Sequence, residues 1–63
     1  MMKLIYRDKE WELAHGMTIR DAIIKIGLNP EAVLPLRQGK LISEDNIGQE
    51  NDVITLIAVV SGG

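Results

Sequence analysis

The last three residues of the chain, Ser61, Gly62 and Gly63, follow directly after its most continuous apolar run. A free carboxyl terminus has a pKa of about 3.5, so it is ionised at neutral pH. The anion is a poor electrophile and reacts with a nucleophile only after activation. Because glycine has no Cβ, neither of the last two residues shields this carboxylate or restricts its backbone. The first question is therefore whether the chain end is itself the reactive group.

Other side chains that could carry chemistry are few. His15 is the only histidine, and no cysteine accompanies it, so a solvated loop residue is a better interpretation than a base or a metal ligand. The complete lack of cysteine excludes disulfides, thiolate zinc sites and a side-chain thiol nucleophile. The carboxylates of Glu44, Asp45, Glu50 and Asp52 occur in a polar stretch, where such residues are usually solvated. An independent enzyme is the weakest of the functional classes.

Length and charge exclude further classes of protein and of partner. With 63 residues and a net charge of -2, the chain is expected to fold as one small domain. A domain of this size buries only about 60% of its unfolded surface, so a deep catalytic cleft is not expected. Lysine and arginine occur singly among acidic residues, which argues against nucleic acid as a partner. Without a signal-peptide pattern or a stretch that could span a bilayer, a cytoplasmic protein is expected, with no membrane contact and monomeric when free.

The first half of the chain predicts a hairpin followed by a helix. Apolar and polar residues alternate over residues 2–6 and again around Trp11, which indicates two strands joined by a tight turn at Asp8-Lys9. Thr18 can cap the start of a helix of about three turns, and Gly27 supplies the left-handed residue that ends it. Its apolar residues recur at i, i+3, i+4 and i+7 and form one stripe: Ile19, Ala22, Ile23 and Ile26.

The second half predicts three more extended segments. Two short strands flank a turn at Gln38-Gly39, and Pro35 in the first of them cannot donate a ladder hydrogen bond. Pro35 therefore indicates an edge strand or a position whose N–H would point outward. The final strand, from residue 53, is apolar on both faces, which is typical of a central strand covered on both sides. The predicted fold is α+β, a ββαββ mixed sheet of four strands with one helix packed on one face.

A single helix covers only one face of such a sheet, so the other face is expected to remain open. Ile5, Ile57 and Val59 fall on that open face. Scattered surface aliphatics are normal in proteins. These residues, however, are expected to be neighbours and to lead directly into the chain end, which favours a docking patch.

Five stretches, taken in order, cover most of the chain: MKLIYRDKEWEL, GMTIRDAI, RQGKLI, ENDVITLI and VVSGG. Together they resemble the ThiS/MoaD family of ubiquitin-like, β-grasp sulfur carriers, and the short length is closer to ThiS. A terminal Gly-Gly alone is weak evidence, but Gly-Gly placed directly after the last strand of a ββαββ pattern, in a chain of this length, is fairly specific. The resemblance implies a β-grasp domain over residues 1–60 and a flexible Ser-Gly-Gly tail over residues 61–63.

The resemblance also implies a chemistry. An ATP-dependent adenylyltransferase of the ubiquitin-activating type joins AMP to the terminal carboxylate, here that of Gly63. A sulfur donor such as a cysteine desulfurase then provides the sulfur, and the resulting thiocarboxylate delivers it to an acceptor synthase. Thiamine thiazole is the first expected product, with molybdopterin or another thio-cofactor as alternatives. The chain is expected to be a carrier that holds no cofactor or metal, with ATP-Mg used by the activating partner, and the expected docking residues are Ile5, Ile57, Val59 and Val60.

Two other functions remain open at this point. A ubiquitin-like modifier is activated in the same way, but it forms an isopeptide bond between Gly63 and a lysine of a target protein. A non-catalytic β-grasp interaction domain does not need Gly62 or Gly63 at all. The sequence does not separate these alternatives from the carrier, because all three share the same fold and the same residues.

Overall fold

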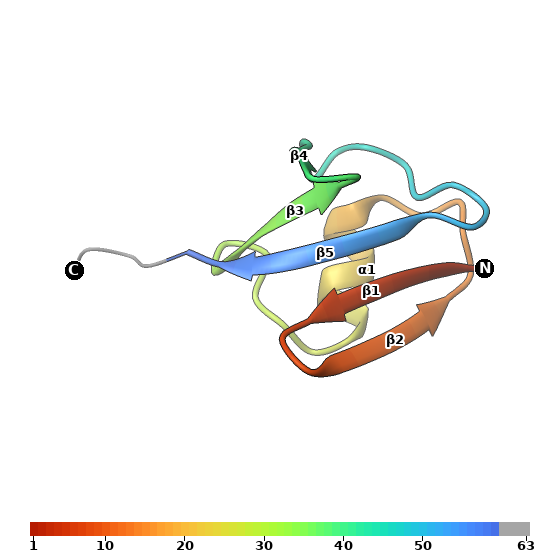
Figure 1. Ribbon diagram of the computed structural model, residues 1–63. Helices are drawn as coiled ribbons and strands as arrows, with labels where there is room; N and C mark the ends of the chain where they lie inside the picture. Colours follow the sequence, from red (N-terminus) through yellow and green to blue (C-terminus); the bar gives the residue numbers. More distant parts are fainter. Residues whose placement is uncertain (60–63) are drawn as a thin grey trace.

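The computed structural model describes residues 1–59. Its strands and helix are, in chain order, β1 (Met2–Tyr6), β2 (Lys9–Leu13), α1 (Ile19–Lys25), β3 (Val33–Arg37), β4 (Lys40–Leu41) and β5 (Val53–Ala58). The strands form one sheet in the order β2-β1-β5-β3-β4, and α1 packs against one face of it (Figure 1). β1 is parallel to β5, and the other strand pairs are antiparallel.

This arrangement confirms the predicted ββαββ-type mixed sheet with one helix, as in the β-grasp fold. The sheet has five strands rather than the four predicted, because the very short β4 pairs with the end of β3 and counts as a strand of its own. The parallel pairing of the first and last strands places β5 in the centre of the sheet. The chain therefore reaches its C-terminal end from the middle of the sheet.

The β1–β2 hairpin turns one residue earlier than the sequence predicts. Tyr6 pairs with Lys9, so the turn residues are Arg7 and Asp8 rather than Asp8-Lys9. Arg7 has a φ of 57°, in the left-handed region. Turn positions with this conformation usually carry Gly or Asn, so the sequence gives no local signal for the correct turn.

Helix α1 begins and ends where the sequence predicts. The side chain of Thr18 accepts a first-turn backbone N–H at 3.1 Å. At the other end Gly27 has a φ of 88°, and its N–H donates to the carbonyl of Ile24 while Leu28 N–H donates to Ile23, which together form a Schellman motif. Between these caps only seven residues are helical, so α1 has about two turns rather than three.

The core lies between α1 and the sheet. Ile19, Ala22 and Ile23 of the predicted stripe are fully buried, and Ile26 is partly buried against them. Ile24, off the stripe, is 50% exposed. The sheet contributes the remaining buried apolar side chains, which are Met2, Leu4, Val33, Ile54 and Leu56. Aliphatic side chains and Met2 therefore form the buried core of residues 1–59, and Tyr6 and Trp11 pack against it partly buried.

Pro35 lies in an inner strand, since β3 has β5 on one side and β4 on the other. Its carbonyl accepts the N–H of Ile42 at 3.1 Å, on the β4 side. The N and the C=O of one residue point to the same side of an antiparallel strand, so the missing N–H of Pro35 also faces away from β5. The second of the two predicted explanations is therefore the correct one, and the ladder with β5 loses no hydrogen bond.

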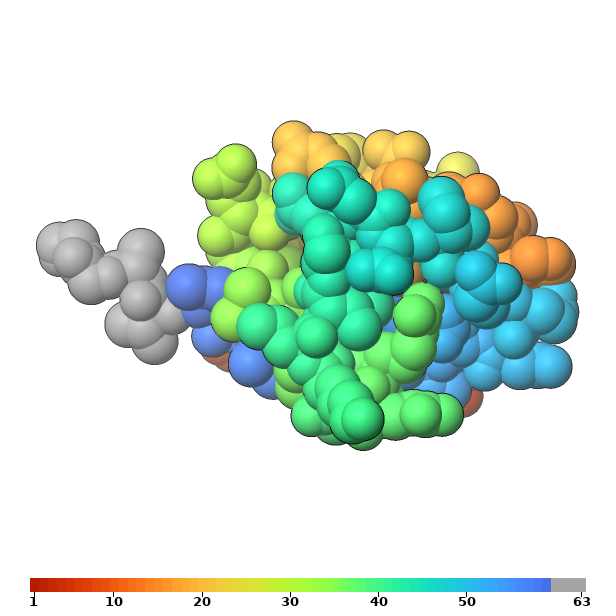
Figure 2. Space-filling view, turned by 90° about the horizontal axis from the view of Figure 1, so that it is seen from above, coloured from red at the N-terminus to blue at the C-terminus, as the bar shows by residue number. Residues whose placement is uncertain are grey.

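The loop of residues 43–52 is anchored mainly through its backbone. Gly48 N–H donates to Met17 at 2.8 Å, and the carbonyl of Gly48 accepts from Gly16 at 2.9 Å. Gly48 is buried so closely against the side chain of Met2 that a Cβ has no room there. Ile47, the only large apolar side chain of the loop, is 44% exposed. In Figure 2, which views the molecule from above, this loop crosses the face toward the viewer and lies beside the helix.

Candidate functional site

Strand β5 carries the chain toward its predicted reactive end. It bonds to β1 on one side and to β3 on the other. Just beyond it, Val59 N–H donates to the carbonyl of Ala32 at 2.9 Å, which ties the end of the strand to the segment that follows α1. Figure 2 shows the end of β5 beside that segment. The predicted tail of Ser61, Gly62 and Gly63, and the predicted docking residue Val60, lie outside the described residues.

The sheet face opposite α1 carries the other predicted docking residues. Along β5, Ile54 and Leu56 are buried beneath the helix, whereas Ile57 is 41% exposed. Val59, just past the strand, is 38% exposed, and Ile5 on the adjacent β1 is half-buried. β5 has the central position in the sheet that its two-sided apolarity predicts. Its face opposite α1 is open, as expected when a single helix covers one face.

One neighbour of these residues is not singled out by the sequence. Leu34 of β3 pairs with Ile57 of β5 and is 38% exposed. The signal for Leu34 is the alternation along β3, but it identifies a face only after the register with β5 is known. Ile5, Leu34, Ile57 and Val59 are called the open-face patch below.

The open-face patch ends at a charged boundary toward β2. Glu10 of β2 pairs with Ile5, and its carboxylate lies 3.4 Å from the ammonium of Lys3. Both side chains are largely exposed, so this ion pair contributes little to stability. An apolar centre beside a charged rim is the usual composition of a protein docking surface.

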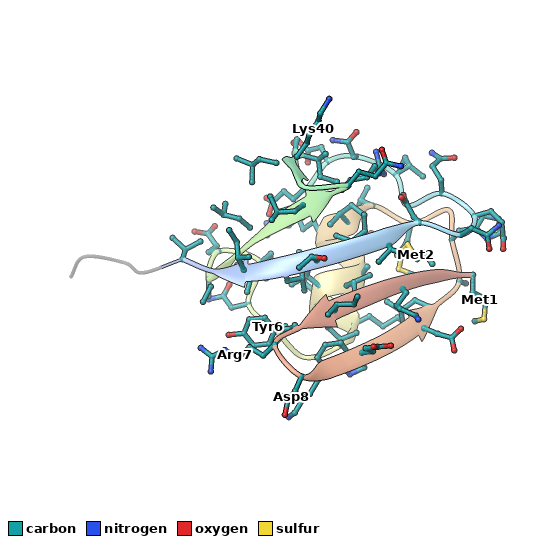
Figure 3. All side chains as sticks on the ribbon, viewed as in Figure 1. Met1, Met2, Tyr6, Arg7, Asp8 and Lys40 are labelled. Atoms are coloured by element: carbon teal, nitrogen blue, oxygen red, sulfur yellow. The ribbon has the colours of Figure 1, made fainter. Side chains whose placement is uncertain are left out.

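The β1–β2 turn lies at the same end of the sheet as the end of β5. Figure 3 shows Tyr6, Arg7 and Asp8 at this end and Met1 at the opposite one. The guanidinium of Arg7 lies 5.2 Å from the centre of the Tyr6 ring, a distance at which a cation and an aromatic face attract each other. The β1–β2 turn therefore places an exposed cation at the end of the sheet where β5 ends.

The most shielded ion pair in residues 1–59 joins Arg37 to Asp52. Arg37 donates to the two carboxylate oxygens of Asp52 at 3.0 and 2.7 Å, and Gln49 N–H donates to the same carboxylate at 3.0 Å. Burial by itself raises the pKa of Asp52, but the hydrogen bonds from Arg37 and Gln49 and the charge of Arg37 outweigh burial, so the pKa lies below its ordinary value. The pair fixes the start of β5 to the end of β3.

A second titratable cluster lies at the end of the sheet away from the predicted tail. His15 Nδ1 lies 2.7 Å from the carboxylate of Glu50, which also accepts from the N-terminal amine of Met1. The hydrogen bond from this amine, together with the charges of the amine and of His15, lowers the pKa of Glu50 against the opposing effect of desolvation. His15 is about half exposed, in agreement with its interpretation as a solvated loop residue.

Residues 1–59 provide neither a metal site nor a membrane span. This part of the chain has no group of three or more His, Asp or Glu side chains placed to hold a metal ion. The single helix found there is too short to cross a membrane. What the described residues do provide is a central strand that leads to the chain end, with an exposed apolar patch beside it.

The chain is similar to a known family and to a named protein. The family model described as the ThiS family matches residues 2–63. A protein named "Sulfur carrier protein TtuB", from Thermus thermophilus, is 31% identical over 55 residues, which span 87% of this chain and 85% of that protein. The family match extends through the terminal Ser-Gly-Gly.

Proposed function

The chain belongs to the ThiS family of sulfur carriers, and from this premise we propose that it carries sulfur on the terminal carboxylate of Gly63. An ATP-dependent adenylyltransferase of the ubiquitin-activating type joins AMP to this carboxylate and releases pyrophosphate. The persulfide of a sulfur donor such as a cysteine desulfurase then displaces AMP, and a thiol reductant cleaves the resulting S–S bond to release the thiocarboxylate. The thiocarboxylate passes its sulfur to an acceptor synthase. The chain acts in the cytoplasm as a cosubstrate, and the partner binds ATP-Mg.

One observation supports this proposal most strongly. The family match covers residues 2–63, so it continues without interruption from β5 through the tail to Gly63. Adenylation supplies the leaving group that an ionised carboxylate lacks. Gly62 and Gly63 add no side chain beside the acyl carbon, so the tail fits a narrow channel. The three tail residues, when extended, span roughly 10 Å, enough to bring the carboxylate into a nucleotide site on a partner.

The open-face patch supplies the contact that brings the partner near. Full burial of an aliphatic side chain contributes roughly 1.5 to 3 kcal/mol. Ile57 and Val59 still expose 41% and 38% of their surface, so covering them on docking contributes about two fifths of that amount each. The two together favour association by about 1 to 2.5 kcal/mol before the entropy of association is subtracted. A gain of this size supports brief docking and release, as a carrier requires.

Thiamine thiazole is the proposed destination of the sulfur. The support for this choice is the ThiS family match and the short chain. The other acceptor reactions to test are those that form molybdopterin, a sulfur-containing amino acid and thiolated tRNA. Reconstitution of each acceptor reaction with the thiocarboxylate form of the chain, followed by mass spectrometry of the product, distinguishes them.

Deletion of Gly63 tests the proposal directly. The truncated chain should lose AMP transfer with the adenylyltransferase and ATP, while its thermal unfolding midpoint stays nearly unchanged, because the buried core of residues 1–59 is formed by residues between Met2 and Leu56. In the intact chain, incubation with the enzyme and a sulfur donor should exchange one terminal oxygen for sulfur, which intact-mass measurement detects.

Three outcomes contradict the carrier function. Normal adenylation of the truncated chain shows that Gly63 is not the reactive residue. A Gly-Gly remnant on lysines of other proteins, without a thiocarboxylate on the chain, supports the ubiquitin-like modifier instead. Full biological activity after deletion of Gly62 and Gly63 supports the non-catalytic interaction domain.

A further inference from the structure

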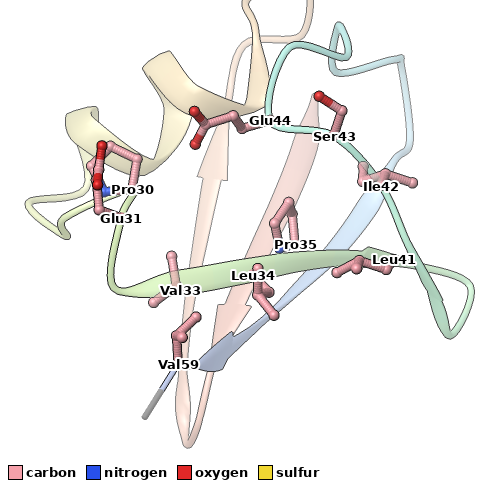
Figure 4. Close-up of a pocket in the computed structure, with 10 residues that line it drawn as sticks. All are labelled: Pro30, Glu31, Val33, Leu34, Pro35, Leu41, Ile42, Ser43, Glu44 and Val59. Atoms are coloured by element: carbon pink, nitrogen blue, oxygen red, sulfur yellow. The ribbon is translucent and has the colours of Figure 1, made fainter. Parts of the chain in front are cut away.

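A groove opens where β5 ends, between β3 and the segment that leaves β4 (Figure 4). Its volume is about 360 Å³, and Val59, the last described residue, lines it. The groove thus begins at the root of the predicted tail. It shares Leu34 and Val59 with the open-face patch and continues beyond the patch to Leu41.

The shortness of β4 creates this groove. β4 pairs only with the last two residues of β3, and the last hydrogen bond between the two segments is from Ile42 N–H to Pro35, so beside Leu34 the chain has already left the sheet. The side chains of Leu34 and Leu41 consequently remain 38% and 61% exposed. An exposed leucine pair beside an open hollow is a site at which an apolar side chain from another protein gains burial.

The backbone at the centre of this groove cannot pair with an added strand from a partner. Pro35 has no N–H to donate, and its carbonyl already accepts the N–H of Ile42 at 3.1 Å. A peptide that adds to a sheet edge needs free donors and acceptors along that edge. The groove therefore suits inserted side chains rather than an added strand.

The charges of the groove have one sign. Its charged lining residues are Glu31 and Glu44, and none is a cation. Arg20 lies 3.0 Å from Glu44 and offsets that charge from the helix side. In Figure 4 the two carboxylates lie on one side of β3 and Leu34 on the other. An occupant that matches both features combines an aliphatic side chain with a neighbouring cation.

The length of the tail connects this groove to the activating enzyme. Residues 60–63, when extended, span at most about 14 Å. An enzyme that takes the carboxylate of Gly63 into its nucleotide site must therefore cover the surface around Val59, where the groove begins. We propose that the adenylyltransferase inserts an aliphatic side chain, next to a lysine or arginine, into this groove. This inference rests on the proposed function.

Substitution of Leu41 tests the apolar half of the inference. The assay is ATP–pyrophosphate exchange by the adenylyltransferase of the same organism, with the full-length chain as the varied substrate. Leu41→Asn should raise the KM for the chain about tenfold without changing kcat, as expected when one aliphatic contact is lost. Ile24→Asn is the matched control, because Ile24 is 50% exposed on the helix and lies away from the groove; its KM should not change.

Reversal of Glu31 tests the charge. Glu31→Lys should raise KM several-fold, and the increase should shrink at high salt, because salt screens exposed charges. Glu12→Lys, an exposed charge reversal on β2 at the opposite edge of the sheet, should leave KM unchanged.

The results that overturn the inference are separate from those that overturn the proposed function. If the unaltered chain is adenylated but Leu41→Asn has the same KM, the groove does not contact the enzyme. Equal increases in KM for Leu41→Asn and Ile24→Asn also exclude the groove, as does a dimer in sedimentation that Leu41→Asn dissociates, since a second copy is then the occupant. If no adenylyltransferase activates the unaltered chain, the proposed function is wrong, and the inference that rests on it is wrong as well.

Discussion

Replacing Asp52 by Asn should weaken the attachment of the loop of residues 43–52 to β3, while the size of the side chain is preserved. Asp52 accepts two hydrogen bonds from Arg37, at 3.0 and 2.7 Å, and one from the backbone of Gln49 at 3.0 Å. The side chain of Asp52 is 10% exposed and that of Arg37 is 28% exposed, so water screens this pair less than the surface pairs. Asn keeps one acceptor oxygen but removes the charge.

The expected loss is large for a chain of this length. A hydrogen bond to a charged group contributes about 1.5 to 3 kcal/mol. At 0.05 to 0.15 kcal/mol per residue, the whole domain has a free energy of unfolding of roughly 3 to 9 kcal/mol. We expect Asp52→Asn to lower the free energy of unfolding by about 2 kcal/mol at neutral pH. The unfolding midpoint should then fall by about 8 to 16 °C.

The loss should depend on pH with a defined sign. The pKa of Asp52 is lower in the folded chain than in the unfolded chain, so the carboxylate stabilises the fold fully above about pH 4, the ordinary pKa of aspartate. This stabilisation disappears as the pH falls through the lower pKa of the folded state. The difference between the unaltered chain and Asp52→Asn should therefore shrink as the pH is lowered below about 4. The lowered pKa of Glu50 acts equally in both chains and cancels in the difference.

Urea unfolding followed by circular dichroism, at about pH 7 and about pH 3, measures this difference. Glu44→Gln is the control, because it breaks the ion pair with Arg20. In this pair the side chain of Glu44 is 36% exposed and that of Arg20 is 44% exposed. An exposed pair of this kind contributes at most about 1 kcal/mol. Equal losses in the two variants, or a loss in Asp52→Asn that does not change with pH, would refute the reasoning.

The two ends of α1 give further predictions. Thr18→Ala should lower the free energy of unfolding by about 1 kcal/mol, and Thr18→Ser should restore most of it, because a hydroxyl again accepts the first-turn N–H. Gly27→Ala should lower the free energy of unfolding by about 1 kcal/mol, because alanine is strained at a φ of 88°. No steric clash adds to this loss, since a Cβ at this position would have no atom within 4 Å. Gly27→Asn should lose less, because asparagine tolerates this conformation. Thermal unfolding checks each pair, and equal midpoints within a pair would contradict the assigned cause.

The local elements of the fold can be predicted from short stretches of the chain. Thr18 and Gly27 mark the ends of α1, and the spacing of Ile19, Ala22 and Ile23 identifies its buried face. These features depend on residues within one or two helical turns of each other, so the sequence contains all the information they need. The hairpin turn is the exception, because Arg7 adopts a conformation that its residue type does not favour.

The candidate site was predictable only in part. The exposure of Ile57 follows from the order of residues along β5 and from the presence of a single helix, whereas the role of Gly63 stays a prediction. Leu34 and the groove beside Pro35 do not, because they depend on where β4 stops pairing and on the register of β3 with β5. A shift of one residue in that register would turn Leu34 to the other face.

By itself, the sequence determines which segments become strands and where the helix begins and ends. Only the tertiary structure decides which of these segments become neighbours. It places Leu34 beside Ile57 and Asp52 against Arg37, and it stops β4 after two residues so that the groove opens at Val59. The physical reason is range: caps and alternation act between residues close in the chain, whereas strand pairing joins residues that are far apart in it.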